Sequence, residues 1–263
     1  PLWFAQEVDG IRPDIRIMNS SYLDGEWYVD EMKCKANGAD GIPFSLPREK
    51  YTFVNDWIPV IDKLERAVDA KEVMEFIRSN DSRTKYDIGM GEPVDFIPTK
   101  QIALPVDKDA AIASGIVKES DRDLMVDTVY INLKKSSLSR SELMLLDMFA
   151  NFDWKRPIYF TQAYMLNAFG LVDYLQFDGY AYRFVPILTP LQDSWEVGRV
   201  DADYAYDVLM NKTKHGGISN PNVYVDSFMH HNIMVARTRE SYARVAKQYI
   251  LQGEYARAEE LLD

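Results

Sequence analysis

The sequence is poor in the side chains that build disulfide frameworks and metal clusters. It contains one cysteine, Cys34, and three histidines in 263 residues. A single cysteine cannot close an internal disulfide and cannot form a cysteine-based metal cluster. Asp226 and His230 would share one face of a helix, but no third ligand follows at the spacing of a metal motif. We therefore expect neither a metal nor a cofactor.

Basic residues are also scarce relative to acidic ones. The chain has 30 Lys and Arg against 41 Asp and Glu, a formal net charge of −11. Nucleic-acid binding needs clustered Lys and Arg to neutralise phosphates, so we expect no nucleic-acid partner. No apolar run approaches the roughly 18 residues that span a bilayer. Because the first residues include neither a start methionine nor the basic part of a signal peptide, we expect the chain to be part of a longer protein.

Signatures of catalysis are missing as well. The sequence has no Gly-x-Ser-x-Gly nucleophile elbow, no His-Glu-x-x-His zinc motif and no Gly-rich phosphate loop. An acidic chain of this length produces about two or three Asp-x-Asp pairs by chance, so such pairs are weak indicators of metal sites. We expect them at the surface or at helix N-caps, with Asp201 just before a helical stretch. The pairs are Asp107/Asp109, Asp121/Asp123 and Asp201/Asp203.

What the sequence does contain is an alternation of strands and helices. Residues 128–133 are rich in β-formers, residues 139–150 carry a helical apolar stripe, and residues 156–160 form a short apolar run. Ser139 and Glu142 have the spacing of a capping box at the start of the helix. Strand, capped helix and strand within about 35 residues favour a βαβ unit with neighbouring parallel strands. The predicted fold class is α/β, with a mostly parallel, Rossmann-like sheet flanked by helices.

Polar side chains follow the predicted strands at their carboxyl ends. Residues 14–19 alternate apolar and polar side chains and predict a first strand, and residues 180–186 predict a later or edge strand. In an open parallel sheet, ligands bind beyond the carboxyl ends of the strands. The candidate ligand-binding residues are Asn19 and Ser20 after the first strand, Asn132 and Lys134 after the second, and Thr161 and Gln162 after the third.

Aromatic residues are abundant, with 16 tyrosines and 5 tryptophans. Aromatic faces can stack on sugar rings, so a carbohydrate platform is one interpretation. Most of these residues fall at core-type spacing, and a buried ring with a hydrogen-bonded polar edge is the usual arrangement. We therefore expect core positions for Trp27, Tyr28, Tyr130 and Tyr159.

The pattern becomes helical from Val200 onward. Within residues 242–262, two amphipathic helices flank Gly253. Their small, aromatic and turn residues match about two-thirds of one 34-residue tetratricopeptide repeat. A plain helical hairpin packed on the domain is an equally good interpretation. The predicted domains are an α/β domain over residues 1–199 and a helical, tetratricopeptide-like extension over residues 200–263.

Several blocks of the sequence resemble a known family. The clearest are residues 1–19 (PLWFAQEVDGIRPDIRIMN), 27–33 (WYVDEMK), 156–160 (RPIYF) and 182–186 (YRFVP). They resemble DUF2723, a family of membrane proteins common in the Bacteroidetes. That family is similar to C-type glycosyltransferases and to a eukaryotic protein O-mannosyltransferase. Its members have a multi-span membrane part, with the catalytic acidic residues, followed by a soluble region. The resemblance therefore implies no catalytic residue in this chain.

The resemblance also implies a location and partners. The chain would be the extracytoplasmic, periplasmic domain of a glycosyltransferase-like protein of a bacterial inner membrane. Its partners would be the membrane-spanning part of the parent chain and an acceptor protein or glycan, which the domain positions without catalysis of its own. Two alternatives stay open. One is a free-standing α/β enzyme acting on a nucleotide or sugar at the strand ends, and the other is a helical protein-interaction module.

Overall fold

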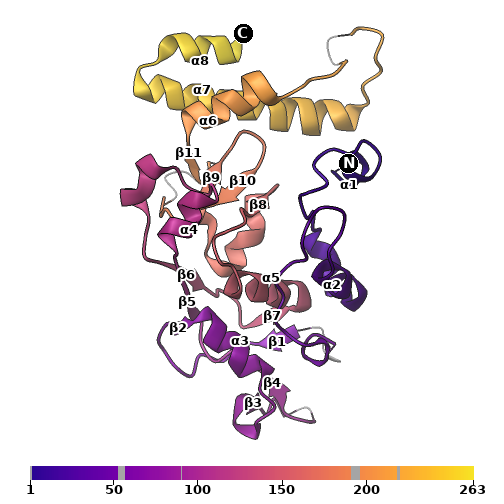
Figure 1. Cartoon of the computed structure of the whole chain (residues 1–263), viewed down its shortest axis with the longest axis vertical. Coiled ribbons are helices and arrows are strands. Elements are labelled where there is room, and N and C mark those ends of the chain that lie inside the picture. Colours follow the sequence, from indigo (N-terminus) through magenta and orange to yellow (C-terminus); the bar gives the residue numbers. More distant parts are fainter. Residues whose placement is uncertain (1, 53–56, 90, 191–195, 218–219) are drawn as a thin grey trace. The chain divides into compact units, whose positions relative to one another are not determined.

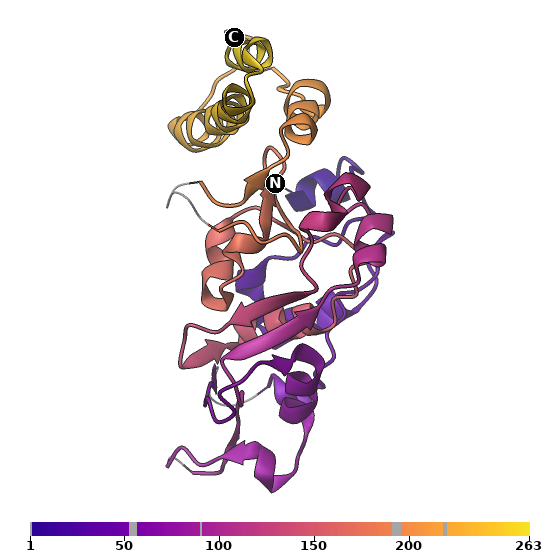
Figure 2. The same ribbon diagram turned by 90° about the vertical axis from the view of Figure 1, so that its left-hand side faces the viewer.

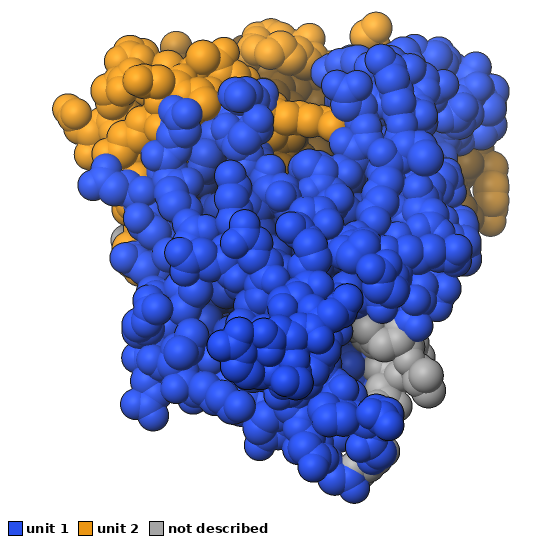
Figure 3. All heavy atoms as spheres, turned by 60° about the horizontal axis from the view of Figure 1, so that its bottom comes forward, with its two compact units in different colours: residues 1–107, 127–155, 168–170 blue, residues 108–126, 156–167, 171–263 orange. Residues whose placement is uncertain are grey.

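The chain forms two compact units whose segments alternate along the sequence (Figure 3). The structure is a computed structural model that describes residues 2–52, 57–89, 91–190, 196–217 and 220–263. Unit 1 contains residues 1–107, 127–155 and 168–170, and unit 2 contains residues 108–126, 156–167 and 171–263. The chain therefore changes unit repeatedly before it reaches its helical tail. The predicted division at residue 199 stays a prediction.

Unit 1 is organised around one almost fully buried helix, α5 (Arg140–Ala150) (Figure 1). The helix begins as predicted: the Ser139 hydroxyl accepts from the Glu142 N–H, and the Glu142 carboxylate accepts from the Ser139 N–H at 3.0 Å. This capping box satisfies backbone donors that have no partner within the helix. The strand before it, β7 (Ser137–Ser139), pairs antiparallel with β1 (Trp57–Pro59).

A three-stranded sheet is the largest sheet of unit 1 (Figure 2). β5 (Gln101–Pro105) lies between β2 (Val68–Asp69) and β6 (Thr128–Asn132). β2 runs parallel to β5, whereas β6 runs antiparallel to it, with Ile131 opposite Ile102. Both isoleucines are buried, so this pair contributes to the core. The helix α3 (Ala70–Arg78) follows β2 directly and contacts α5.

The first part of unit 1 contains short helices where a strand was predicted. Residues 14–19 form no strand, and Asn19 instead caps η1 (Ser20–Asp24). Arg12 and Asp14 form a local ion pair at 2.8 Å, and none of the strands in the described part of the chain pairs with this segment. An alternating pattern becomes a strand only where another strand supplies hydrogen bonds. The remaining elements are α1 (Leu2–Glu7), α2 (Glu26–Lys33), η2 (Arg48–Lys50), η3 (Ser82–Thr84), β3 (Lys85–Tyr86) and β4 (Val94–Asp95).

Unit 2 contains a sheet in the order β11-β9-β10-β8. β10 (Tyr182–Phe184) is antiparallel to both β9 (Leu175–Phe177) and β8 (Tyr159–Phe160). The strand predicted over residues 180–186 therefore exists, but it is interior and not an edge strand. β11 (Arg199–Val200) pairs parallel with β9 at one edge of this sheet. Unit 2 also contains α4 (Lys108–Ala113), η4 (Glu119–Leu124) and η6 (Val172–Tyr174), and η5 (Ala163–Phe169) begins in unit 2 and ends in unit 1.

The predicted fold class is wrong in its central feature, the mostly parallel, Rossmann-like sheet. Within the described residues, the strands form small sheets in which β2–β5 and β9–β11 are parallel and the other pairs are antiparallel. β6, α5 and β8 occur in the predicted order, but β6 and β8 belong to different sheets. The fold is mixed α/β. The local spacing of apolar residues specifies a single helix or strand. The pairing of strands depends instead on contacts with residues far along the chain.

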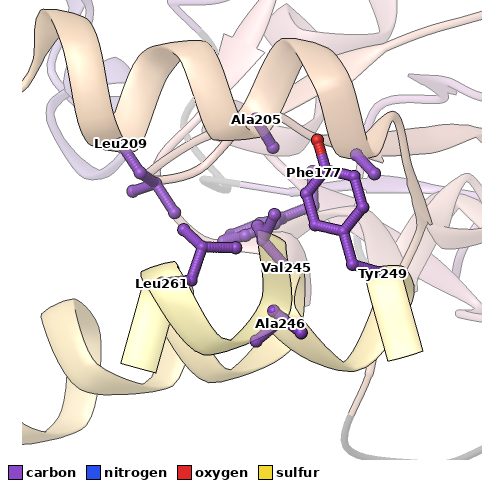
Figure 4. Packing of buried hydrophobic residues seen from close by; sticks show 9 residues of the cluster. Phe177, Ala205, Leu209, Val245, Ala246, Tyr249 and Leu261 are labelled. Carbon is purple, nitrogen blue, oxygen red and sulfur yellow. The ribbon is translucent and has the colours of Figure 1, made fainter. Parts of the chain in front are cut away.

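The tail of unit 2 is a small helical bundle with its own core (Figure 4). Leu209 and Phe177 pack there against α7 (Glu240–Gln252) and α8 (Tyr255–Leu262). α7 ends at Gly253, whose φ of +82° suits glycine, and the Glu254 N–H donates to the Tyr249 carbonyl at 2.9 Å. The predicted hairpin around Gly253 is confirmed, and its identity as a tetratricopeptide repeat stays a prediction. α6 (Ala202–Tyr206) and the π-helix η7 (Asp207–Lys212) also contribute residues to this core. The π-helix η8 (Met229–Arg239) leads directly into α7 and buries none of its residues.

Candidate functional site

Two predicted ligand-binding residues, Asn19 and Ser20, lie at the start of η1 in unit 1. The Asn19 side chain accepts a hydrogen bond from the Ser21 N–H at 3.1 Å. The Asn19 N–H donates to the hydroxyl of Tyr28 at 2.8 Å. These bonds fix the start of η1 against α2, so Asn19 has a structural role beside an aromatic cluster.

Asn132 and Lys134 lie together at the end of β6, also in unit 1. The Lys134 N–H donates to the carbonyl of Ala168 at 3.2 Å. Gly170 approaches β6 so closely that an added Cβ would lie 3.3 Å from the Cβ of Asn132. Segment 168–170 therefore packs against the end of this strand, while both predicted side chains stay exposed.

Thr161 and Gln162 follow β8 in unit 2. The six predicted residues are therefore divided between the two units. They would lie together only at the carboxyl ends of one parallel sheet, and the described strands form no such sheet. Their role in ligand binding stays a prediction.

An aromatic cluster reaches the surface of unit 1. Trp27 is 63% exposed, Tyr22 is 45% exposed and Trp3 is 42% exposed. The ring centroids of Trp3 and Tyr22 are 5.9 Å apart, and those of Tyr22 and Trp27 are 6.5 Å apart. Beneath them, Tyr28 is buried and contacts Trp27 edge-on at 5.4 Å. The cluster therefore has an exposed layer of rings on a buried support.

The expected core positions are correct for Tyr28 and wrong for the other three aromatic residues. Trp27, Tyr130 and Tyr159 are exposed. Consecutive helical residues point about 100° apart, so Trp27 turns away when Tyr28 faces the core. Tyr130 lies on the exposed face of β6, because side chains alternate along a strand.

Gly25 determines where the indole of Trp27 lies. A Cβ at Gly25 would be 2.8 Å from Nε1 of Trp27 and 3.3 Å from the Tyr22 carbonyl oxygen. The indole thus rests against bare backbone, and a side chain at residue 25 would displace it. Nε1 is the indole atom that lies nearest to this position.

Unit 2 contains a cavity of about 360 Å³, which is the second candidate site. Arg183 lines it and is buried. Its Nε donates to Oδ2 of Asp178 at 2.8 Å, and its Nη1 donates to the Gly115 carbonyl at 2.7 Å. The guanidinium carbon lies 4.8 Å from the ring centroid of Tyr204, which stacks on the charged group. Ile112, Ile116 and Val117 supply apolar wall.

The charged side chains of this cavity are paired. Burial disfavours the charged guanidinium, but the hydrogen bond to Asp178 and its negative charge outweigh this effect, so the pKa of Arg183 lies above its usual value. Each charged side chain that lines the cavity has an opposite partner within the described residues of unit 2. The pairs are Arg183–Asp178, Lys118–Asp201, Glu119–Arg122 and Asp121–Arg199.

The last Asp-x-Asp pair has structural roles in the helical bundle. Asp201 caps α6 as predicted, because its side chain accepts from the Tyr204 N–H at 3.2 Å. Asp203 accepts from the Tyr249 hydroxyl at 3.0 Å and pairs with Arg257. The hydrogen bond from Tyr249, with further help from Arg257, lowers the pKa of Asp203. This carboxylate therefore joins α6 to both helices of the hairpin.

Acidic residues and histidines do not gather into a metal site in the part of the chain that the structure describes. No three or more Asp, Glu, His or Cys side chains meet there. Asp226, which was predicted to share a helical face with His230, accepts from the Met229 N–H at 2.9 Å. It therefore acts as a local cap before η8.

Arg183 and Tyr204 of the cavity, and Trp3 and Tyr22 of the aromatic cluster, were not among the residues predicted from the sequence. One signal was available for Arg183, which is the charged residue inside the apolar run Tyr182–Val185. A charge in such a run is buried only with a partner. For Trp3 no signal was available, because the run Leu2-Trp3-Phe4 also fits a buried helix.

Residues 1–204 match a protein family described as TMEM260-associated domain 2. The chain belongs to this family. Membership of this family associates the domain with a membrane protein. The assignment of the chain to DUF2723 stays a prediction. No curated protein and no solved structure matches this TMEM260-associated domain. Among the described helices, none has both the length and the apolar character that crossing a bilayer requires.

Proposed function

We propose that this TMEM260-associated domain is the extracytoplasmic, non-catalytic part of a multi-span, glycosyltransferase-like membrane protein. Its role is to hold an acceptor protein or glycan for the membrane part. The family match over residues 1–204 carries the proposal. The resemblance of residues 1–19 and 156–160 to DUF2723 supports the glycosyltransferase-like parent and the periplasmic side.

The cavity of unit 2 is the proposed acceptor site. Each of its charged side chains is already paired with an opposite charge, so an uncharged polar group fits it best. Gln176 and Arg183 offer hydrogen bonds, and Tyr204 and Ile112 offer an apolar surface. The hydrogen bonds of Arg183 to Asp178 and Gly115 hold the guanidinium in place, which suits binding better than proton transfer.

The side of the membrane on which the domain lies can be tested at Cys34. This residue is exposed and is the single cysteine of this chain. In cells with a permeabilised outer membrane, we expect a membrane-impermeant maleimide to label Cys34 without lysis. The Cys34→Ser variant controls for other cysteines of the parent protein. Labelling that appears only after lysis of the inner membrane would contradict the extracytoplasmic location.

Acceptor binding can be tested by filling the cavity. Ile112→Trp places a large ring at its wall, and we expect it to reduce affinity for neutral oligosaccharides or glycoprotein acceptors in calorimetric titrations by roughly tenfold or more. Ala113→Trp is the matched control, because Ala113 is exposed on the same helix and does not line the cavity. Equal affinities for the two variants would contradict an acceptor site here.

Protein capture by the helical hairpin is a second candidate function. Leu251 is 72% exposed and Tyr255 is 68% exposed on either side of the Gly253 turn. A photo-crosslinking side chain at residue 251 in the native membrane would form a defined adduct if this surface holds a partner. We expect Tyr255→Glu to remove that adduct. An adduct that persists in this variant would contradict capture by the hairpin.

A further inference from the structure

Gln176 and Arg183 are neighbouring polar residues in the wall of the unit 2 cavity. They lie directly opposite each other on β9 and β10, and both are buried. Nε2 of Gln176 donates to Oδ1 of Asp178 at 2.9 Å, and Nε of Arg183 donates to Oδ2 of the same carboxylate at 2.8 Å. Because one carboxylate holds both side chains before any ligand arrives, binding loses little side-chain entropy.

Each of these two side chains has one polar atom that the fold leaves unused. Nη1 of Arg183 donates to the carbonyls of Gly115 and Ile116 at 2.7 and 3.3 Å, whereas Nη2 has no acceptor among the described residues. The side-chain carbonyl oxygen of Gln176 likewise has no donor in the described part of the chain. Neither atom is a fully buried atom without a partner, so both stay accessible on side chains that line the cavity. The cavity therefore offers a hydrogen-bond donor close to an acceptor.

An apolar wall adjoins this polar pair. It consists of Ile112, Ile116 and Val117, and the Ile116 carbonyl bonds to the guanidinium of Arg183. Sugar hydroxyls could use the donor and the acceptor, but they would leave the wall against water. A secondary amide with a methyl group fits all three parts. Its carbonyl accepts from Nη2 of Arg183, its N–H donates to the carbonyl oxygen of Gln176, and its methyl group covers the wall.

The size and charge of the cavity favour such an amide on a sugar. A volume of about 360 Å³ is near the lower end of the range for small-molecule sites, so the cavity suits one sugar residue better than a long peptide segment. The charged side chains that line it already have opposite partners. An acetamido group is polar and uncharged, so it binds without leaving a charge unpaired.

We propose that the cavity of unit 2 recognises the acetamido group of an N-acetylated amino sugar. Arg183 and Gln176 bind the amide, and the apolar wall contacts its methyl group. This assignment rests on the acceptor site proposed above and names the class of sugar that the site selects. No covalent bond forms or breaks there, so the two residues determine specificity and do not catalyse a reaction.

Saturation-transfer NMR on the 263-residue chain tests this proposal. The ligands are the trimer of N-acetylglucosamine and the trimer of glucose with the same linkage, which differ in having an acetamido or a hydroxyl group on each ring. We expect the acetylated trimer to bind at least about tenfold more tightly, because glucose leaves the amide-binding atoms and the apolar wall unmatched. Saturation should be strongest at the acetamido methyl protons, which contact the wall.

The role of Gln176 can be tested by Gln176→Met, which removes the acceptor and keeps a side chain of similar length. We expect its affinity for the acetylated trimer to fall roughly tenfold, toward the affinity for the glucose trimer. Gln101→Met is the matched control, because Gln101 is an exposed glutamine of unit 1, and it should bind as the unchanged chain does. Near-UV circular dichroism shows whether Gln176→Met keeps the fold, and the comparison of the two trimers on the unchanged chain needs no variant.

Several outcomes would overturn the proposal. Equal affinity for the two trimers, lost in Ile112→Trp, would remove the acetamido assignment and leave the acceptor site in place. Binding of neither trimer would remove both the assignment and a glycan site in this cavity. Undiminished affinity in Gln176→Met would exclude the proposed contact with the amide N–H. Binding of N-acetylalanine methylamide, which has the amide without a sugar, in preference to both trimers would assign the cavity to a peptide.

Discussion

Arg183 donates from Nε to Oδ2 of Asp178 at 2.8 Å, and both side chains are almost completely buried in unit 2. Gln176 donates to the second oxygen of the same carboxylate at 2.9 Å. The pair connects the end of β9 to β10 beside the cavity. Removing two charges from water offsets much of their attraction, so such a pair adds little net stability. Losing one partner, however, leaves the other charge buried and unpaired.

Asp178→Asn should therefore lower the free energy of unfolding by roughly 3–5 kcal/mol. The double variant Asp178→Leu with Arg183→Met should recover much of this loss, because no charge then stays buried. Urea unfolding of the three proteins measures both effects. Asp207→Asn, which breaks an exposed pair with Lys212, should leave stability nearly unchanged. A double variant less stable than the single one would contradict this account.

A second prediction concerns Asp147, a fully buried carboxylate of α5 in unit 1. It accepts from the N–H and the hydroxyl of Ser45, at 2.7 and 2.6 Å, and from the N–H of Leu46 and the side chain of Asn151. In the variant Asp147→Asn, the side-chain NH2 group would face hydrogen-bond donors that now bond to the carboxylate. We expect a loss of about 2–3 kcal/mol in the free energy of unfolding. Asp153→Asn, at an exposed carboxylate, should change it far less.

A third prediction concerns the capping box. Ser139→Ala leaves the Glu142 N–H without its acceptor and should lower the free energy of unfolding by about 1 kcal/mol. Ser139→Asp keeps an acceptor and should restore most of this stability. Thermal unfolding compares the two variants with Ser120→Ala, an exposed control. Equal melting temperatures for Ser139→Ala and Ser139→Asp would show that the cap does not stabilise α5.

A fourth prediction concerns pH. The hydrogen bond from Tyr249, together with Arg257, lowers the pKa of Asp203 below its usual 3.8. A lowered folded-state pKa stabilises the fold above the unfolded-state pKa, and this stability is lost as pH falls through the folded-state value. Asp203→Asn should thus be less stable than the unchanged chain at pH 7, and the difference should shrink below about pH 4. It should stay within about 1 kcal/mol, because Asp203 is largely exposed.

The pH dependence of unfolding in both proteins is the measurement. A difference that grows as pH falls below 4 would have the wrong sign and would contradict the assignment.

Helix boundaries could be predicted because their causes lie within a few residues. The capping box of Ser139 and Glu142 and the left-handed turn at Gly253 are both decided by neighbouring backbone groups. The prediction of these elements therefore needed no knowledge of the rest of the chain.

Strand pairing could not be predicted in the same way. The alternation of β6 indicates a strand, but its partner is β5, which runs in the opposite direction and precedes it by more than 20 residues. Nothing in the local pattern distinguishes this partner from a parallel one. Residues 14–19 have a similar alternation but pair with none of the described strands, and they form a loop.

The candidate sites were the least predictable part, because each depends on distant residues. Arg183 is buried because Asp178 and the carbonyl of Gly115, 68 residues away, accept its hydrogen bonds. Trp27 is exposed because Tyr28 takes the inward position on α2, and its place over Gly25 follows only from the folded backbone. Residue type suggested aromatic binding surfaces in general but did not indicate which rings stay outside.

The alternation of the two units along the chain also sets the order of folding during synthesis. Within this chain, residues 1–107 of unit 1 precede its last segment, residues 168–170, so the unit is incomplete until that segment emerges. At roughly 5–20 residues per second, the first segments wait on the order of 10–30 s for their last partners. During that time the nascent protein exposes core surface to chaperones and proteases. Its yield in the cell should therefore depend on translation speed and chaperone supply, even for variants whose final stability is unchanged.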